Sequence, residues 1–186
     1  MTKKLWNTDG GNSSDEINLF LAGEDIELDR AIFIYDIDAT SAHIKSLHSI
    51  GVLKKVELNK LEKSLKDLKE RFIKGSFKLT NKYEDCHSAI EFFLTKELGD
   101  LGKKVHTGRS RNDQVIVAMR LFAKASLLEV KKINKKIART FLSLAKKYEN
   151  IPMPGYTHLQ RAMPSSWGLW FSSYAESFID NGDLIN

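Results

Sequence analysis

The sequence has 186 residues, of which 42% are hydrophobic and 28% are charged, and its formal net charge is +5. These proportions are typical of a folded globular protein and exclude a disordered chain and a collagen-like fibre. The single cysteine, Cys86, excludes a disulfide scaffold, and no apolar run approaches the roughly 20 residues that span a bilayer. Residues 1–6 lack the apolar stretch of a signal peptide, so we expect a cytoplasmic protein that does not enter a membrane.

Three helices are predicted in the first half of the chain, which no proline interrupts. Apolar residues recur at helical spacing over residues 28–44, 53–74 and 85–98. The many lysines and glutamates of the second segment are interpreted as a solvated helix face. Strand-like alternation is limited to a short piece at residues 76–79.

The longest periodic segment covers residues 113–148, where most apolar residues are three or four positions apart. At 1.5 Å per residue such a helix would be about 54 Å long, so it needs packing partners along its whole length. We therefore predict a helical bundle built from several chains. A last helix is predicted from near Pro164 toward Phe178, with a turn at Asn181-Gly182.

One boundary divides this pattern, the glycine-rich stretch of residues 99–108. Shorter helices precede it and the long helix follows it. We expect an all-α protein with an N-terminal helical domain over residues 1–112 and the first helices of a central helical bundle over residues 113–186.

Residues 106–114 do not resemble an ordinary connection. Eight of the nine residues in His106-Thr107-Gly108-Arg109-Ser110-Arg111-Asn112-Asp113-Gln114 carry polar side chains. Arginine binds both oxygens of a carboxylate, and the start of a helix favours an anion, so this 106–114 segment predicts a carboxylate-bearing small-molecule substrate. The alternative is a polar helix-capping loop in which Asn112 or Asp113 is the N-cap. Two arginines without interleaved aromatic residues argue against nucleic acid as a partner.

A second polar segment covers residues 154–164, between the two long predicted helices. In it His158 is flanked by Thr157 and Gln160, and a histidine can give or take a proton near neutral pH. The alternative is a structural or solvated histidine. No histidine or cysteine pair has the spacing of a metal site, and no glycine-rich nucleotide cradle occurs, so no metal or cofactor is predicted.

In these two segments the sequence resembles the argininosuccinate lyase family, within the fumarase/aspartase superfamily. The motifs that carry the resemblance are HTGRSRNDQ at residues 106–114 and PGYTHLQ at residues 154–160. It extends to Leu5-Trp6, residues 28–30 and 36–43, and residues 167–176, and so covers nearly the whole chain.

The resemblance implies a β-elimination that splits argininosuccinate into arginine and fumarate without cofactor or metal. His158 matches the catalytic histidine, a general acid/base, and Thr157 and Asn112 match substrate-binding positions. Less closely matched substrate contacts are Arg111, Ser110, His106, Gln160 and Asp25. Asp25 stands where many members have a serine, and we expect it to face the cationic guanidinium of the substrate.

Two features depart from the family pattern. Asp9 stands where an arginine is expected, so an anion contact is lost there. Family members also carry a catalytic serine in a glycine-serine-rich loop that these residues do not contain, and their active site is assembled from subunits of a homotetramer. We therefore expect this chain to be inactive alone. Two alternatives stay open: a non-catalytic helical assembly or binding module on the same scaffold, and another superfamily lyase acting on adenylosuccinate or aspartate.

Overall fold

The computed structural model describes residues 23–185, so Leu5-Trp6 and Asp9 lie outside the described residues. The chain forms two compact units, the first ending at Phe122 and the second beginning at Ala123. This boundary falls inside helix α7 (Arg111–Lys147). Across residues 23–185, no helix combines the length and the apolar character needed to cross a membrane.

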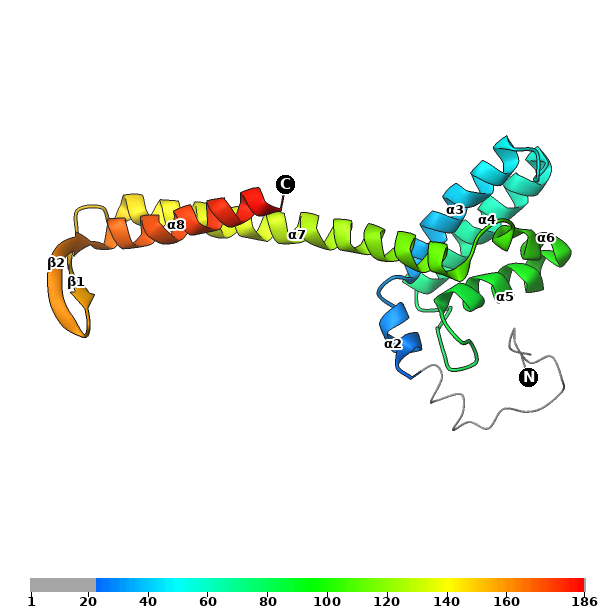
Figure 1. Cartoon of the computed structure of the whole chain (residues 1–186), viewed down its shortest axis with the longest axis horizontal. Helices are drawn as coiled ribbons and strands as arrows, with labels where there is room; N and C mark the ends of the chain where they lie inside the picture. Colours follow the sequence, from blue (N-terminus) through cyan, green and yellow to red (C-terminus); the bar gives the residue numbers. More distant parts are fainter. Residues whose placement is uncertain (1–22, 186) are drawn as a thin grey trace. The chain divides into compact units, whose positions relative to one another are not determined.

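The first unit is built from helices, as the sequence predicts (Figure 1). In chain order they are α2 (Asp25–Asp29), α3 (Phe33–Ser49), α4 (Lys55–Ile73), α5 (Cys86–Leu98), α6 (Asp100–Lys103) and a 3-10 turn, η1 (Lys104–His106). The predicted helices 53–74 and 85–98 are confirmed to within two residues at each end. The first predicted helix is instead divided, because the short α2 precedes α3.

Local sequence explains where these helices begin and which face they bury. Asp85 caps α5: its carboxylate accepts the Ser88 backbone N–H at 2.7 Å, and the Ser88 hydroxyl accepts the Asp85 N–H at 3.1 Å. Along α4, a row of leucines three or four residues apart is buried while lysines and glutamates face outward. The members of this row are Leu58, Leu61, Leu65 and Leu68.

The core of the first unit lies between α3, α4 and α5. Phe33 is fully buried there, with the ring of Phe72 at 4.6 Å edge-on and that of Phe77 stacked at 5.7 Å. Gly102 brings α6 against the backbone of Leu94, where a Cβ atom would have no room. This core therefore holds both α5 and the chain that leads into the 106–114 segment.

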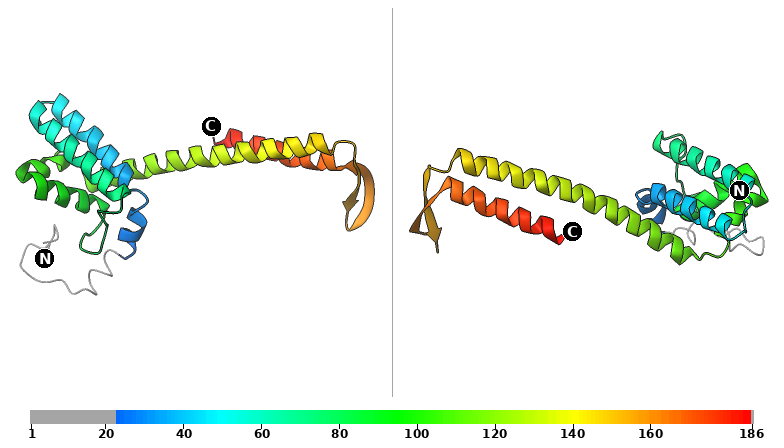
Figure 2. Two further views of the ribbon diagram at one scale, coloured as in Figure 1. Left: turned by 180° about the vertical axis from the view of Figure 1, so that it is seen from behind. Right: turned by 90° about the horizontal axis from the view of Figure 1, so that it is seen from above.

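The second unit contains the C-terminal part of α7, strands β1 (Pro152–Thr157) and β2 (Gln160–Ser166), and helix α8 (Trp167–Leu184). Helix α8 runs back alongside this part of α7 (Figures 1 and 2). Gly168 permits the close approach, since its Cβ would lie 2.5 Å from the Cα of Glu149. Farther along, the Asn134 side chain donates a hydrogen bond to the carbonyl of Phe178.

The antiparallel hairpin of β1 and β2 was not predicted, and the short strand expected at residues 76–79 is absent. Three prolines and a glycine lie in the hairpin, and prolines argue against a strand because they cannot donate to a ladder. Both strands of a two-stranded sheet are edge strands, however, so Pro152, Pro154 and Pro164 are tolerated. The turn expected at Asn181-Gly182 is also wrong, because α8 continues to Leu184.

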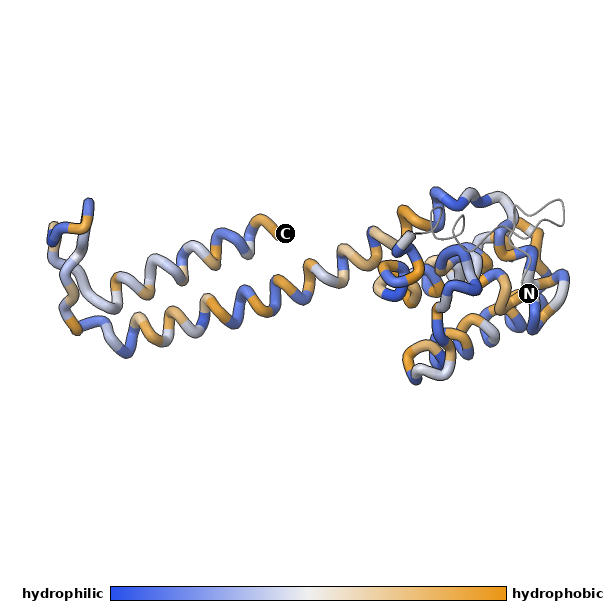
Figure 3. Tube along the Cα trace, turned by 90° about the horizontal axis from the view of Figure 1, so that it is seen from below, coloured by the Kyte–Doolittle hydropathy of each residue, from blue (hydrophilic) through white to orange (hydrophobic). Residues whose placement is uncertain are grey.

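Many large apolar side chains of the second unit remain exposed. Figure 3 shows hydrophobic residues recurring along α7, in keeping with the apolar periodicity predicted for residues 113–148. The exposed apolar residues of this unit include Leu127, Leu128, Val130, Ile133, Leu142, Trp167, Leu169, Trp170, Tyr174 and Ile179. A pair of helices with this much apolar surface in water is typical of an element that packs against further helices.

Candidate active-site segments

The 106–114 segment joins η1 to the start of α7. Gly108 has a φ of 68°, a left-handed conformation that glycine adopts without steric cost. Helix α7 begins at Arg111, and Ser110 and Asp113 cap it reciprocally. The Ser110 N–H donates to the Asp113 carboxylate at 2.8 Å, and the Asp113 N–H donates to the Ser110 hydroxyl at 3.3 Å. Hydrogen bonding to the Asp113 carboxyl by Ser110, first from its backbone N–H and then from its side chain, lowers the pKa of Asp113. The cap is thus Ser110, and neither Asn112 nor Asp113 takes that place.

A histidine of α3 holds the segment on the N-terminal side of Gly108. His43 donates from its Nε2 to the carbonyl oxygen of Thr107 at 3.0 Å. Partial burial, and then the nearby charge of Arg109, lower the pKa of His43. Its imidazole is therefore held in the neutral form at neutral pH, which leaves one ring N–H to make this bond.

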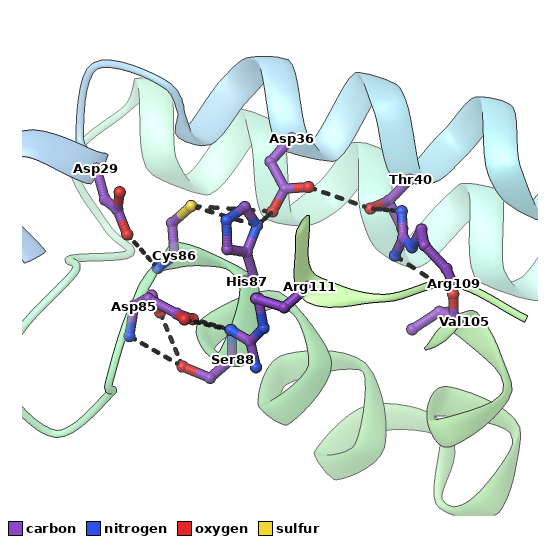
Figure 4. Close-up of polar contacts among 10 residues, drawn as sticks. All are labelled: Asp29, Asp36, Thr40, Asp85, Cys86, His87, Ser88, Val105, Arg109 and Arg111. Carbon is purple, nitrogen blue, oxygen red and sulfur yellow. Dashed lines mark hydrogen bonds and ion pairs between the residues drawn. The ribbon is translucent and has the colours of Figure 1, made fainter. Parts of the chain in front are cut away.

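The two arginines of the segment both make contacts within the protein (Figure 4). Arg109 points toward α3 and donates to the hydroxyl of Thr40 at 3.2 Å and to the carbonyl of Val105 at 3.3 Å. Its Nε has no partner among the described residues. Arg111 forms an ion pair with Asp85, the residue that caps α5, and 31% of the Arg111 side chain remains exposed.

Next to Arg109, a cluster of buried polar side chains lies at the junction of α3 and α5. His87 donates from Nδ1 to Asp36 at 2.6 Å, and neither side chain is more than 3% exposed. The hydroxyl of Thr40 donates to the other carboxylate oxygen of Asp36 at 3.5 Å. Cys86 is also buried, and burial together with the neighbouring carboxylates raises the pKa of its thiol.

Asp36, Cys86 and His87 offer three atoms of the kind that bind metals, all within 4.8 Å of one another. A tetrahedral zinc ion would hold a nitrogen and an oxygen ligand about 3.3 Å apart. The Asp36 and His87 atoms instead lie 2.6 Å apart, which is the length of a charge-assisted hydrogen bond. The cluster is thus arranged as a hydrogen-bonded pair that stabilises the helix junction.

The segment that contains His158 forms the end of the β1–β2 hairpin. Thr157 pairs with Gln160, and the two residues between them, His158 and Leu159, have φ values of 51° and 63°. Turns of this kind normally carry Asn-Gly, and a left-handed residue with a side chain costs about 1–2 kcal/mol. All four side chains are exposed, and Leu159 is 99% exposed. The hairpin therefore presents His158 to solvent at a strained position, which is a feature of functional sites.

The structure divides the predicted site residues between the two units. His106, Ser110, Arg111 and the exposed Asn112 lie together in the first unit, around the start of α7. Asp25 is exposed at the first position of α2 in the same unit.

Thr157, His158 and Gln160 lie together in the second unit, at the hairpin end. Sequence reasoning missed the buried group of Asp36, Thr40 and His87. The one signal available was an aspartate on the face of the first predicted helix that carries its apolar residues.

Comparison with solved structures identifies the class of protein to which this architecture belongs. An EDDS lyase variant with bound fumarate aligns with a TM-score of 0.73 at 25% sequence identity, over 95% of this chain and 35% of its own. A fumarate lyase:delta crystallin from Brucella melitensis shares the fold, with a TM-score of 0.69 at 16% identity, over 85% of this chain and 39% of its own. The helical fold is that of the fumarase/aspartase superfamily of lyases.

Within that class, the Lyase family model matches residues 17–183, so the chain belongs to this family. Among curated proteins, an argininosuccinate lyase of Xanthomonas oryzae pv. oryzae (strain PXO99A) is 49% identical over 97% of this chain and 42% of its own length. An argininosuccinate lyase of Xylella fastidiosa (strain Temecula1) is 48% identical over 97% of this chain and 41% of its own length. The chain thus spans about two-fifths of the length of these relatives.

Proposed function

We propose that this chain is part of an argininosuccinate lyase, which splits argininosuccinate into arginine and fumarate as a step of arginine biosynthesis in the cytoplasm. The observation that carries the proposal is the 49% identity to argininosuccinate lyases over nearly the whole chain. The matched stretch includes both polar segments, and neither segment is part of the hydrophobic core.

The chemistry that we assign to these residues is the chemistry that the resemblance to argininosuccinate lyases implies. A β-elimination needs a proton to leave the carbon beside a carboxylate, a proton to reach the departing nitrogen, and fixed donors for the charge that develops. We assign His158 as the general acid/base because it matches the catalytic histidine of the family, and its imidazole is exposed at the hairpin turn with Thr157 beside it. Asn112 binds substrate from the start of α7, where the helix dipole favours a carboxylate.

The remaining contacts that we assign are weaker. Arg111, Ser110, His106 and Gln160 are assigned to the carboxylates of the substrate, and Asp25 to its guanidinium. For Arg111 the assignment means that Asp85 orients the guanidinium while its exposed part faces the ligand.

We further propose that turnover requires residues that this chain does not contain and a homotetramer of the longer protein. The exposed apolar side chains of α7 and α8 support assembly, since a stable bundle would cover them. The relatives are more than twice as long as the matched stretch, which leaves room for a further catalytic group.

An activity assay with complementation tests the proposal. The chain alone should release no fumarate from argininosuccinate. Adding the part of the Xanthomonas relative that follows the matched stretch should restore fumarate release. His158→Asn should abolish this restored release, whereas the control His48→Asn, which replaces a histidine of α3, should not. Fumarate release by the chain alone would contradict the claim that it is incomplete. Adenylosuccinate and aspartate assayed in parallel should remain intact; turnover of either would instead identify another superfamily lyase.

A binding measurement separates an enzyme from a non-catalytic helical module. Titration calorimetry of the complemented mixture should show argininosuccinate binding that Asn112→Ala and Thr157→Ala weaken. Absence of binding, with no effect of either substitution, would favour the assembly module.

A further inference from the structure

We propose that Arg109 is a positioning residue, which anchors the 106–114 segment to α3 through the hydroxyl of Thr40. The expected effect on substrate binding rests on the proposed function. The hydrogen bonds of Arg109 themselves do not depend on that function. Of the two arginines in the segment, Arg109 is the one whose guanidinium is turned inward, with both terminal nitrogens bonded to protein groups (Figure 4). We assign it a role in holding the loop and no contact with substrate.

The charge of Arg109 explains why its guanidinium lies near the carboxylate of Asp36. A partly desolvated guanidinium is unfavourable unless a negative charge lies near, and the buried carboxylate of Asp36 supplies that charge. Asp36 is fully buried, accepts a hydrogen bond from His87 and lies near the positive charge of Arg109. The anchor thus joins the segment to the α3–α5 junction.

Thr40 links the two charges because its hydroxyl both accepts and donates a hydrogen bond. Its oxygen accepts the N–H of Arg109 while its proton is donated to Asp36. Serine would retain both bonds, whereas valine has the same shape and makes neither. Thr40→Ser and Thr40→Val therefore form a matched pair that changes the hydrogen bonds with little change in packing.

The anchor bears directly on the residues assigned to the substrate. The segment is held on one side of Gly108 by the bond from His43 to Thr107, and on the other side by Arg109. Gly108 itself is left-handed, a conformation that lets the chain turn between these two ties. The Arg109 tie acts together with the Ser110–Asp113 cap and the Arg111–Asp85 ion pair to hold the chain that leads to Asn112. Asn112 lies three residues from Arg109, at the start of α7.

Hydrogen exchange of the 186-residue chain tests the anchor without substrate. In Thr40→Val and Arg109→Gln, the amides of residues 106–112 should exchange about tenfold faster, as expected for the loss of a hydrogen bond to a charged group. Amides of the α4 core should stay within about twofold of the parent. Thr40→Ser should match the parent, and Arg109→Lys, which keeps the charge but loses the planar fork, should lie between. Unchanged exchange in Arg109→Gln would overturn the proposal. If Thr40→Val also speeds exchange in the α4 core, the anchor is tested by comparing Arg109→Lys with Thr40→Ser. Faster exchange of residues 106–112 in Arg109→Lys than in Thr40→Ser supports the anchor, and equal exchange overturns it.

Binding of argininosuccinate to the complemented mixture tests the consequence. Arg109→Gln and Thr40→Val should each weaken binding about tenfold, and the double variant should be no weaker than either, because both substitutions break the same hydrogen bond. Additive losses would show that Arg109 contacts the ligand directly and would overturn the positioning role. If the unsubstituted protein binds no argininosuccinate, the proposed function fails, while hydrogen exchange still decides whether the anchor exists.

Discussion

Gly102→Ala is the substitution for which the structure predicts the clearest effect. Gly102 is buried on α6, and a Cβ atom there would lie 2.4 Å from the carbonyl carbon and oxygen of Leu94 and from the nitrogen of Thr95. These are backbone atoms of α5 and cannot rotate away. Ordinary contact begins near 3.4 Å, so α6 must move outward by about 1 Å, and overpacking of this kind costs about 1–3 kcal/mol.

Urea unfolding followed by far-ultraviolet circular dichroism measures this cost. With an m-value of about 2 kcal/mol/M, the midpoint should fall by about 0.5–1.5 M. Lys103→Ala is the matched control, because its exposed side chain lies on the same short helix and should change stability by less than about 0.5 kcal/mol. An unchanged midpoint for Gly102→Ala would refute the close approach of α6 to α5.

Three further predictions concern the first unit. Because the pKa of His43 is lowered in the fold, its contribution to stability should be complete above about pH 6.5 and be lost as the pH falls below that value. Urea midpoints at about pH 7.5 and 5 should therefore differ less in His43→Gln than in the parent, and an equal difference would contradict the assignment. Cys86 should resist a thiol reagent in the folded protein and react once urea unfolds it, because it is buried and its pKa is raised; rapid labelling of the folded chain would refute this burial. Leu65→Ala removes a fully buried side chain and should cost about 2–5 kcal/mol in urea unfolding, while a comparable loss in the neighbouring Lys66→Ala would show that core packing is not the cause.

The sequence alone was sufficient for the helices because their signals are local. The spacing of Leu58, Leu61 and Leu65 marks the buried face of α4, and backbone bonds within adjacent turns then define the helix. The same local logic located the long helix and the two polar segments. It failed at the hairpin, where prolines and a His158-Leu159 turn lack the usual composition of strands and tight turns.

Only the tertiary structure decided which polar groups are buried and what they contact. The sequence treats Arg109 and Arg111 as equivalent donors for a carboxylate, but the fold turns Arg109 toward Thr40 and pairs Arg111 with Asp85. The physical reason is sequence separation. Periodicity describes residues a few positions apart, whereas Arg109 meets a residue 69 positions away, and only packing of the helices brings the two together. The motifs thus determined which family the sequence resembles, and the packing of α3 and α5 decided how the residues of the 106–114 segment are held.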